Sequence, residues 1–167
     1  MNYSGIKYGD MLNGRGIRVS LFLTGCSHQC QGCFNPSTWN HKTGTPFTEA
    51  TQEEIFQYFY KYRDMLTGLS LLGGDPTFHT NIEPLKKFVR EFKEKFPEKD
   101  IWIWSGYTWE EIQMDDSLFS LVSLCNVLID GKFRSEEKDT SLKWRGSRNQ
   151  RVIDIQKSMT EKSLNFL

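Results

Sequence analysis

The sequence predicts an α/β fold, a partial, open β/α barrel with mainly parallel strands, and three observations support this prediction. β-rich and amphipathic segments alternate along the chain, which is typical of parallel strands joined by right-handed helical crossovers. The 167 residues are too few for a complete eight-fold barrel, which needs about 250. Polar or glycine-rich residues follow the predicted strands, as expected where the carboxyl ends of parallel strands build a site.

Five short segments have the composition of strands. They are residues 16–23, 68–72, 101–104 and 127–129, with 152–155 as the weakest candidate. A barrel with so few strands stays open on one side.

Three segments are predicted as helices. Residues 51–66 have apolar side chains at helical spacing, with Thr51 and Glu54 placed as a capping box. Thr108 begins another helix, with Glu111 as its capping partner.

Between them lies an amphipathic helix that Asn81 and Pro84 open and Pro97 stops. Its apolar stripe consists of Leu85, Phe88, Val89, Phe92 and Phe96.

Composition and charge limit the classes of function. Apolar residues make up 38% and charged residues 25% of the chain, proportions typical of a soluble globular protein. Lysine plus arginine and aspartate plus glutamate both number 21, and a net charge of zero argues against nucleic-acid binding. No stretch has the length and apolarity of a membrane span, and the start of the chain lacks the apolar core of a signal peptide. We therefore expect a cytoplasmic protein that binds no membrane.

The chain is expected to form one domain over residues 1–156, followed by a flexible tail over residues 157–167. Residues 132–151 hold seven basic and three acidic side chains, which favours a solvated loop, with a docking surface as the alternative. Cys125 is expected to be a buried small hydrophobe.

The strongest feature of the sequence is a group of three cysteines directly after the first predicted strand, Cys26, Cys30 and Cys33, spaced C-x3-C-x2-C. In a reducing compartment such clustering indicates metal ligation rather than disulfides. A cysteine stripe on a buried helix is disfavoured, because glycine and proline flank the group. A structural zinc site needs a fourth ligand, for which His28 and His41 are candidates. Three soft thiolates without an obvious fourth ligand suit an iron–sulfur cluster with one open iron.

The cysteine pattern, followed by Phe34, resembles the signature of the radical S-adenosylmethionine (SAM) enzymes. The resemblance implies a radical SAM type of partial barrel. It implies one 4Fe-4S cluster, ligated by Cys26, Cys30 and Cys33, whose open iron chelates the amino and carboxylate groups of SAM. It also implies that Phe34 lies near the adenine, and that the backbone from Gly32 to Phe34 contacts the cofactor.

A second element, Gly73-Gly74-Asp75-Pro76, follows the second predicted strand. Alone it is an ordinary turn. At the end of the strand that follows the cysteines, it resembles the Gly-Gly-Glu-Pro motif of the same family, which holds the ammonium of SAM. The resemblance implies that Gly73, Gly74 and Asp75 bind the cofactor, and Asp75 replaces the more common Glu.

Within that family the chain resembles the activating proteins of anaerobic (class III) ribonucleotide reductases over nearly its whole length. The blocks that carry the resemblance are residues 13–16, 33–39, 101–107, 127–133 and 144–150. Arg15 replaces the usual proline and Phe34 the frequent tyrosine.

The resemblance implies an enzyme. In this family a reduced cluster splits SAM into methionine and a 5′-deoxyadenosyl radical, which takes a hydrogen atom from a glycine Cα. The implied partners are the large subunit of the anaerobic ribonucleoside-triphosphate reductase as protein substrate and a small flavoprotein as electron donor. One alternative is a radical SAM enzyme that acts on another glycyl-radical enzyme or a small heterocycle. An alternative from a different class is a zinc-stabilised binding module without catalysis.

Other residues near the predicted site have weaker assignments. His28 is expected beside the cluster or at the surface rather than as a ligand. Trp104 is a candidate for the edge of the cofactor, and Asp130 for a contact with SAM or an incoming loop. Arg145 and Arg148 are candidates for docking or cofactor contact. No catalytic side chain beyond the cluster ligands is predicted.

Overall fold

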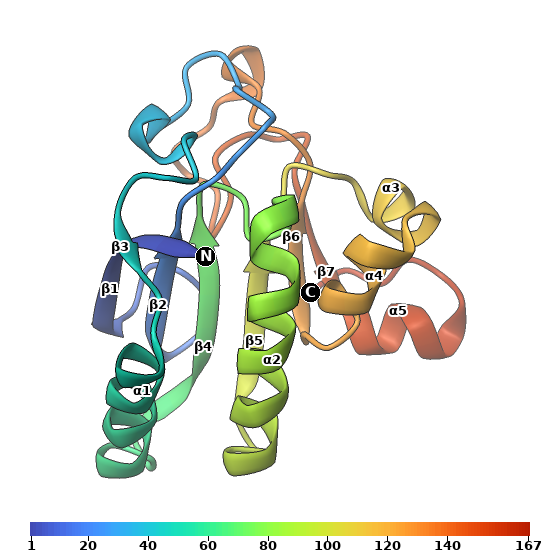
Figure 1. Ribbon diagram of the computed structural model, residues 1–167. Helices are drawn as coiled ribbons and strands as arrows, with labels where there is room; N and C mark the ends of the chain where they lie inside the picture. Colours follow the sequence, from blue (N-terminus) through green and yellow to red (C-terminus); the bar gives the residue numbers. More distant parts are fainter.

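The computed structural model describes residues 1–167 as a mixed α/β fold around one seven-stranded sheet (Figure 1). The strands lie in the order β3-β1-β2-β4-β5-β6-β7. Their bounds are β1 Asn2–Asp10, β2 Ile17–Leu23, β3 Thr45–Pro46, β4 Leu66–Gly73, β5 Asp100–Trp104, β6 Val127–Asp130 and β7 Arg151–Asp154. Strands β2, β4, β5 and β6 pair in parallel, whereas β1, β3 and β7 pair antiparallel at the two edges.

Helices follow the central strands and cover one face of the sheet, with α1 and α2 in front of it in Figure 1. The helices are α1 Glu49–Lys61, α2 His79–Lys95, α3 Trp109–Met114, α4 Asp116–Val122 and α5 Ile155–Glu161, with short 3-10 turns at Pro36–Thr38 and Ser135–Glu137. None of these helices combines the length and the apolarity needed to cross a membrane.

The four central strands confirm the predicted segments, but the edges of the sheet differ from the prediction. Nine of the first ten residues form strand β1, which the sequence analysis did not assign, and β3 pairs with it. The last predicted strand exists as β7, yet it runs antiparallel to β6. Its direction follows from the connection: residues 131–150 contain no α-helix that returns the chain to the other end of the sheet.

Helix α1 differs from the predicted helix at both ends. Its N-cap is Thr48, whose side chain accepts a hydrogen bond from the backbone N–H of Thr51. The capping box is therefore Thr48 with Thr51, and the predicted box of Thr51 with Glu54 is wrong. The helix ends at Lys61, and Leu66 belongs to β4.

Helix α2 begins at His79, two residues before the predicted start at Asn81, and Pro84 lies inside it. The predicted start of α3 is confirmed, because Thr108 and Glu111 form the capping box.

The last residues of the chain return to the sheet. Helix α5 covers most of the first half of the segment expected as a tail. Phe166 forms a β-bridge with Ile153, and the N–H of Leu167 donates to the carbonyl of Val152.

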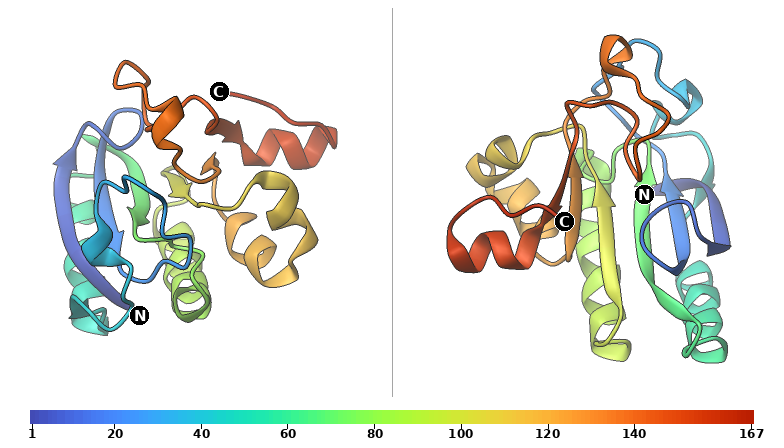
Figure 2. Two further views of the ribbon diagram at one scale, coloured as in Figure 1. Left: turned by 90° about the horizontal axis from the view of Figure 1, so that it is seen from above. Right: turned by 180° about the vertical axis from the view of Figure 1, so that it is seen from behind.

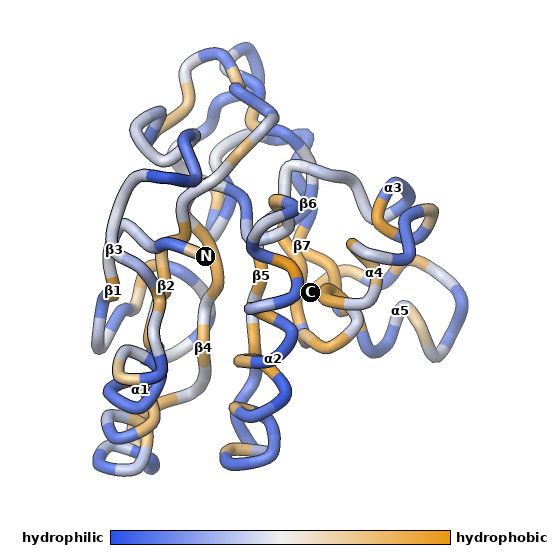
Figure 3. The backbone as a smooth tube through the Cα atoms, viewed as in Figure 1, coloured by the Kyte–Doolittle hydropathy of each residue, from blue (hydrophilic) through white to orange (hydrophobic).

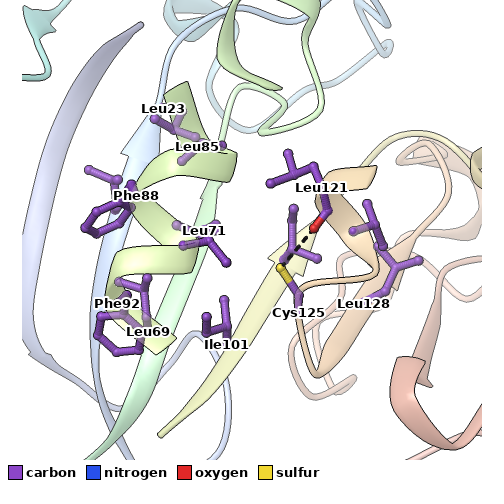
Figure 4. Packing of buried hydrophobic residues seen from close by; sticks show 14 of the residues in the cluster. Leu23, Leu69, Leu71, Leu85, Phe88, Phe92, Ile101, Leu121, Cys125 and Leu128 are labelled. Carbon is purple, nitrogen blue, oxygen red and sulfur yellow. Dashed lines mark hydrogen bonds between the residues drawn. The ribbon is translucent and has the colours of Figure 1, made fainter. Parts of the chain in front are cut away.

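The hydrophobic core lies between the sheet and its helices. Alternate residues of the central strands, such as Val19, Leu21 and Leu23 in β2, belong to the core cluster. Figure 3 shows apolar stretches on the strands and an alternation of orange and blue along α2. The cluster includes Leu23, Leu69, Leu71, Leu85, Phe88, Phe92 and Ile101 (Figure 4). Cys125 lies buried in the same cluster, and burial raises the pKa of its thiol to about 12. The expectation of a small buried hydrophobe at this position is confirmed.

The opposite face of the central strands is polar at its centre. Arg18 is fully buried there, and its guanidinium donates to Ser70 Oγ at 2.7 Å and to the carbonyl of Leu69 at 2.8 Å. Its Nη1 lies 2.6 Å from Oδ1 of Asp100, and the Trp102 ring packs against the same group. A single arginine thus connects β2, β4 and β5 on the face that carries no helices.

Candidate metal and cofactor site

The three predicted ligands lie on the long loop that follows β2. This cysteine loop, residues 24–44, lies at the carboxyl end of the parallel strands, at the top of Figure 1. Its two sides are tied together near the base, because Gly25 N–H donates to the carbonyl of Thr38 at 2.7 Å and Cys26 N–H to that of Trp39 at 3.0 Å. The cysteines therefore sit on a closed loop with a fixed base.

Cys26, Cys30 and Cys33 are all free and partly buried. Cys33 N–H donates to the carbonyl of Cys30 at 3.1 Å, which makes a tight turn between these two. Burial raises the pKa of the Cys26 thiol to about 11, and the charge of Asp75 adds to the shift. Metal ligation at Cys26 must therefore displace a proton that the buried thiol holds firmly.

No group of three or more His, Cys, Asp or Glu side chains gathers closely enough to hold a single metal ion. The fit to an iron–sulfur cluster rests instead on the chemistry of the donors. Three free thiols on one closed loop are soft anionic ligands once deprotonated, which is the donor set that iron–sulfur clusters use.

The Gly-Gly-Asp turn at the end of β4 packs directly against the base of the cysteine loop. Gly74 N–H donates to the carbonyl of Leu23, and Asp75 N–H to the carbonyl of Gly25, at 2.8 and 2.7 Å. A Cβ on Gly73 would lie 2.5 Å from backbone atoms of Leu23, and one on Gly74 would lie 2.7 Å from the carbonyl oxygen of Gly25. The two predicted motifs are thus brought into contact, and both glycines are required by close backbone packing.

The Asp75 side chain is buried and bonded on both oxygens. Oδ1 accepts from the N–H of Thr77 at 2.8 Å and from its hydroxyl at 2.6 Å. Oδ2 lies 2.7 Å from Nε2 of His28 and accepts from the N–H of Gly106 at 3.2 Å. Because a carboxylate has about four acceptor positions, these four contacts use its capacity.

Further polar residues surround Asp75, and of these only Ser105 and Gly106 were expected at this edge, because they follow a predicted strand. The hydroxyls of Thr77 and Ser105 lie 2.8 Å apart, and the N–H of Tyr107 donates to Ser105 Oγ. Asn81, in the first turn of α2, donates to the carbonyls of Thr24 and Asp75. The available signal was the position of Ser105 and Gly106 directly after β5, where polar residues of neighbouring parallel strands converge.

The sequence did not predict how Phe34 and Gly32 lie relative to the rest of the protein. The Phe34 side chain is fully exposed, and a Cβ on Gly32 would meet Phe133 and Ser135 at about van der Waals distance. The segment of residues 131–150 therefore lies beside the cysteine loop, as the orange and light-blue loops show in Figure 2.

Asp130 and Trp104 are engaged within the protein. Asp130 is buried, accepts from the N–H of Trp109 at 2.7 Å and pairs with Arg151. Trp104 Nε1 donates to the carbonyl of Trp144 at 2.8 Å. The contacts of Asp130 join β6 to α3 and β7, and that of Trp104 holds the segment after β6 to β5.

The two candidate arginines of that segment differ in their surroundings. Arg145 donates to the carbonyl of Gln150, whereas Arg148 is exposed, 4.0 Å from Asp139.

Comparisons with known proteins identify the family of this chain. A family described as a 4Fe-4S single cluster domain matches residues 12–153, which include the cysteine loop and the Gly-Gly-Asp turn. The chain is therefore a member of a class of proteins that carry one iron–sulfur cluster. It is 43% identical over 152 residues to the anaerobic ribonucleoside-triphosphate reductase-activating protein of Escherichia coli (strain K12), covering 91% of this chain and 97% of the relative.

Similar proteins occur in other organisms and in a virus. The activating protein of Pasteurella multocida is 42% identical over 150 residues, covering 90% of this chain and 95% of the relative. That of Enterobacteria phage T4 is 43% identical over 152 residues, covering 91% and 93%. The chain belongs to the family of anaerobic ribonucleoside-triphosphate reductase-activating proteins.

Proposed function

We propose that this protein is a radical SAM activase that generates a glycyl radical on an anaerobic ribonucleoside-triphosphate reductase. The observation that carries the proposal is the contact between the cysteine loop and the Gly-Gly-Asp turn, in a chain whose relatives are named for activating this reductase. The edge of parallel strands where the two meet is the usual place for a site in α/β enzymes. The proposal includes a partial barrel of the radical SAM type and a cytoplasmic location.

Each residue of the site has a defined task in this proposal. Cys26, Cys30 and Cys33 ligate one 4Fe-4S cluster as thiolates. When bound, the cluster and SAM together supply the radical chemistry, in which one electron splits SAM into methionine and a 5′-deoxyadenosyl radical that takes a hydrogen atom from glycine. A small flavoprotein is the proposed electron donor.

The remaining contacts orient the cofactor. The backbone of Gly73 and Gly74 would bind the amino-acid end of SAM, and the negative charge of Asp75, whose acceptor positions are used within the protein, would favour its ammonium through space. The backbone from Gly32 through Cys33 to Phe34 contacts the cofactor, with the exposed Phe34 ring available to cover the adenine. The partner is the large subunit of the reductase, whose glycine loop enters from the open end of the site.

The decisive experiment mixes the reduced, iron-loaded protein with SAM and the large subunit of an anaerobic ribonucleotide reductase under anaerobic conditions. Electron paramagnetic resonance (EPR) is expected to show a glycyl doublet on the reductase, together with 5′-deoxyadenosine and methionine. SAM cleavage without the doublet would point to another substrate. If the purified protein is colourless and binds zinc but no iron, the proposal that it is a radical SAM enzyme is refuted.

Cys30→Ala is expected to abolish both SAM cleavage and the doublet, because it removes one of three protein ligands of the cluster. Cys125→Ala is the matched control, since this thiol is buried in the core away from the loop. It should keep iron and activity. Normal activity of Cys30→Ala would contradict the assignment of the cluster ligands.

A further inference from the structure

His28 lies in the cysteine loop between Cys26 and Cys30, yet its side chain is only 5% exposed. Its neighbours Ser27 and Gln29 are both exposed. Gln29 has a φ of 47°, in the left-handed region that residues other than glycine rarely adopt. The loop therefore bends at a conformational cost in a way that buries one particular side chain.

The His28 ring contacts the ends of two neighbouring strands. Its Nε2 lies 2.7 Å from Oδ2 of Asp75, which follows β4. The ring also packs edge-on against Tyr107 after β5, with centroids 4.5 Å apart, and a Cβ on Gly106 would lie 2.2 Å from the ring. The His28 ring thus occupies space that a side chain at residue 106 would fill, and Gly106 leaves this space free.

The hydrogen bond between His28 and the Asp75 carboxylate joins the cysteine loop to the Gly-Gly-Asp turn. No other hydrogen bond of this carboxylate reaches the cysteine loop. The three remaining donors to Asp75 come from Thr77 and Gly106, which belong to the segments after β4 and β5. Only His28 comes from the cysteine loop. Because its Nε2 is already committed to Asp75, this nitrogen is not a free ligand for iron.

We propose that His28 is a positioning residue that fixes the cysteine loop relative to the Gly-Gly-Asp turn. The inference rests on the proposed function, in which a cofactor must contact both parts at once. A cluster on one part and an ammonium site on the other bind the same SAM molecule well only if their separation is held constant. Through His28, the Asp75 carboxylate sets this separation in addition to facing the ammonium.

Two variants separate the hydrogen bond from the packing. His28→Phe keeps an aromatic ring against Tyr107 and Gly106 but cannot donate to Asp75. His28→Gln keeps a donor that can reach the carboxylate. His79→Gln is the control, because His79 is exposed at the start of α2.

Three measurements test the role: iron per chain after anaerobic reconstitution, the dissociation constant for SAM, and the EPR spectrum of the reduced cluster with and without SAM. We expect His28→Phe to bind iron like the parent and to bind SAM about ten-fold more weakly, with a reduced SAM-induced change of the EPR spectrum. His28→Gln should recover most of the affinity. In the iron-free protein, amide hydrogen exchange in residues 26–33 should be faster in His28→Phe than in the parent.

Unchanged SAM affinity and unchanged exchange in His28→Phe would overturn the proposal. Loss of iron in both His28 variants, with the control intact, would also overturn it and make His28 a ligand. If the parent itself binds iron but not SAM, the proposed function fails as well, so the two failures are distinguishable.

Discussion

Asp10, the last residue of β1, is a buried carboxylate whose two oxygens are both hydrogen-bonded. Oδ2 accepts from Asn13 Nδ2 at 2.6 Å and from Ser20 Oγ at 2.7 Å, while Oδ1 accepts from the N–H of Leu12 and lies 2.9 Å from Lys7 Nζ. Burial alone would raise the pKa of this group. The hydrogen bonds outweigh burial and lower the pKa of Asp10 to about 2. The ionised Asp10 carboxylate therefore stabilises the loop after β1 by accepting hydrogen bonds from Leu12 and Asn13.

In the Asp10→Asn variant, the free energy of unfolding is expected to fall less steeply than in the parent as the pH is lowered from 4 to 2. The folded-state pKa of about 2 lies below the ordinary value of 3.8, so the ionised group stabilises the fold above about pH 4 and loses this effect as the pH falls toward 2. The contribution at neutral pH is about 2 kcal/mol. Urea unfolding between pH 2 and 7 measures it, with the exposed Glu83→Gln as control. Parallel acid limbs for Asp10→Asn and the parent would contradict the assignment.

The motifs of the candidate site could be recognised where chemistry and spacing are local. The cysteines stand within one loop, and the Gly-Gly-Asp turn directly follows a strand, so both motifs are visible in the sequence. The pairing of His28 with Asp75 was not predictable, because it joins residues 47 positions apart through a left-handed turn at Gln29. Sequence spacing does not record which way such a turn aims a side chain.

The turn at the end of β4 shows how an element can be required for packing. Gly74 faces the carbonyl oxygens of Gly25 and Thr38, and a Cβ in this position would lie 2.7 and 2.9 Å from them. These are backbone atoms at the base of the cysteine loop and cannot move aside as a flexible side chain would. Gly74 therefore allows the turn after β4 to pack closely against the base of the cysteine loop.

Gly74→Ala is expected to lower the free energy of unfolding by about 1–3 kcal/mol and to reduce the iron bound per chain, because the loop base must shift. Gly5→Ala is the matched control, since nothing lies within 4 Å of the added Cβ in β1. Urea unfolding of the iron-free proteins and iron analysis after reconstitution measure both effects. Equal stability of the two variants would show that the turn is free to relax.

At the level of elements, the sequence identified what hydrophobic pattern and capping residues specify. The apolar runs gave β2, β4, β5 and β6, and the phenylalanine stripe gave α2. Strand β1 was missed because its glycines and two register shifts interrupt the alternation of apolar and polar residues that indicates a strand. The direction of β7 was missed because apolar residues on a strand do not tell which end it starts from. Two threonines three residues apart made the start of α1 ambiguous, and contacts decided for Thr48.

The molecule as a whole has two unlike sides of its sheet. One side is the apolar core under the helices, and the other is centred on the Arg18 network with its buried hydrogen bonds. Burial lowers the pKa of the Arg18 guanidinium, and the neighbouring charge of Asp100 offsets part of this shift. A buried charge whose contacts reach three strands ties the centre of the sheet together.

Arg18→Met is expected to lower the free energy of unfolding by about 3–5 kcal/mol, because Ser70 and Asp100 lose their buried partner on the face of the sheet that carries no helices. Arg63→Met is the control: its ion pair with Glu98 is solvent-exposed, so its loss should change stability far less. Denaturant unfolding of both variants compares them directly. A loss for Arg18→Met no larger than that for Arg63→Met would show that the buried network adds little.

The core under the helices and the loop that carries the cysteines are separate parts of the molecule. The loop is closed at its base by main-chain bonds, and none of the apolar side chains that build the core belongs to it. Oxidative loss of iron would therefore leave the scaffold standing. An iron-free protein that keeps its fold is expected to accept a new cluster, so that loss of iron in air is reversible.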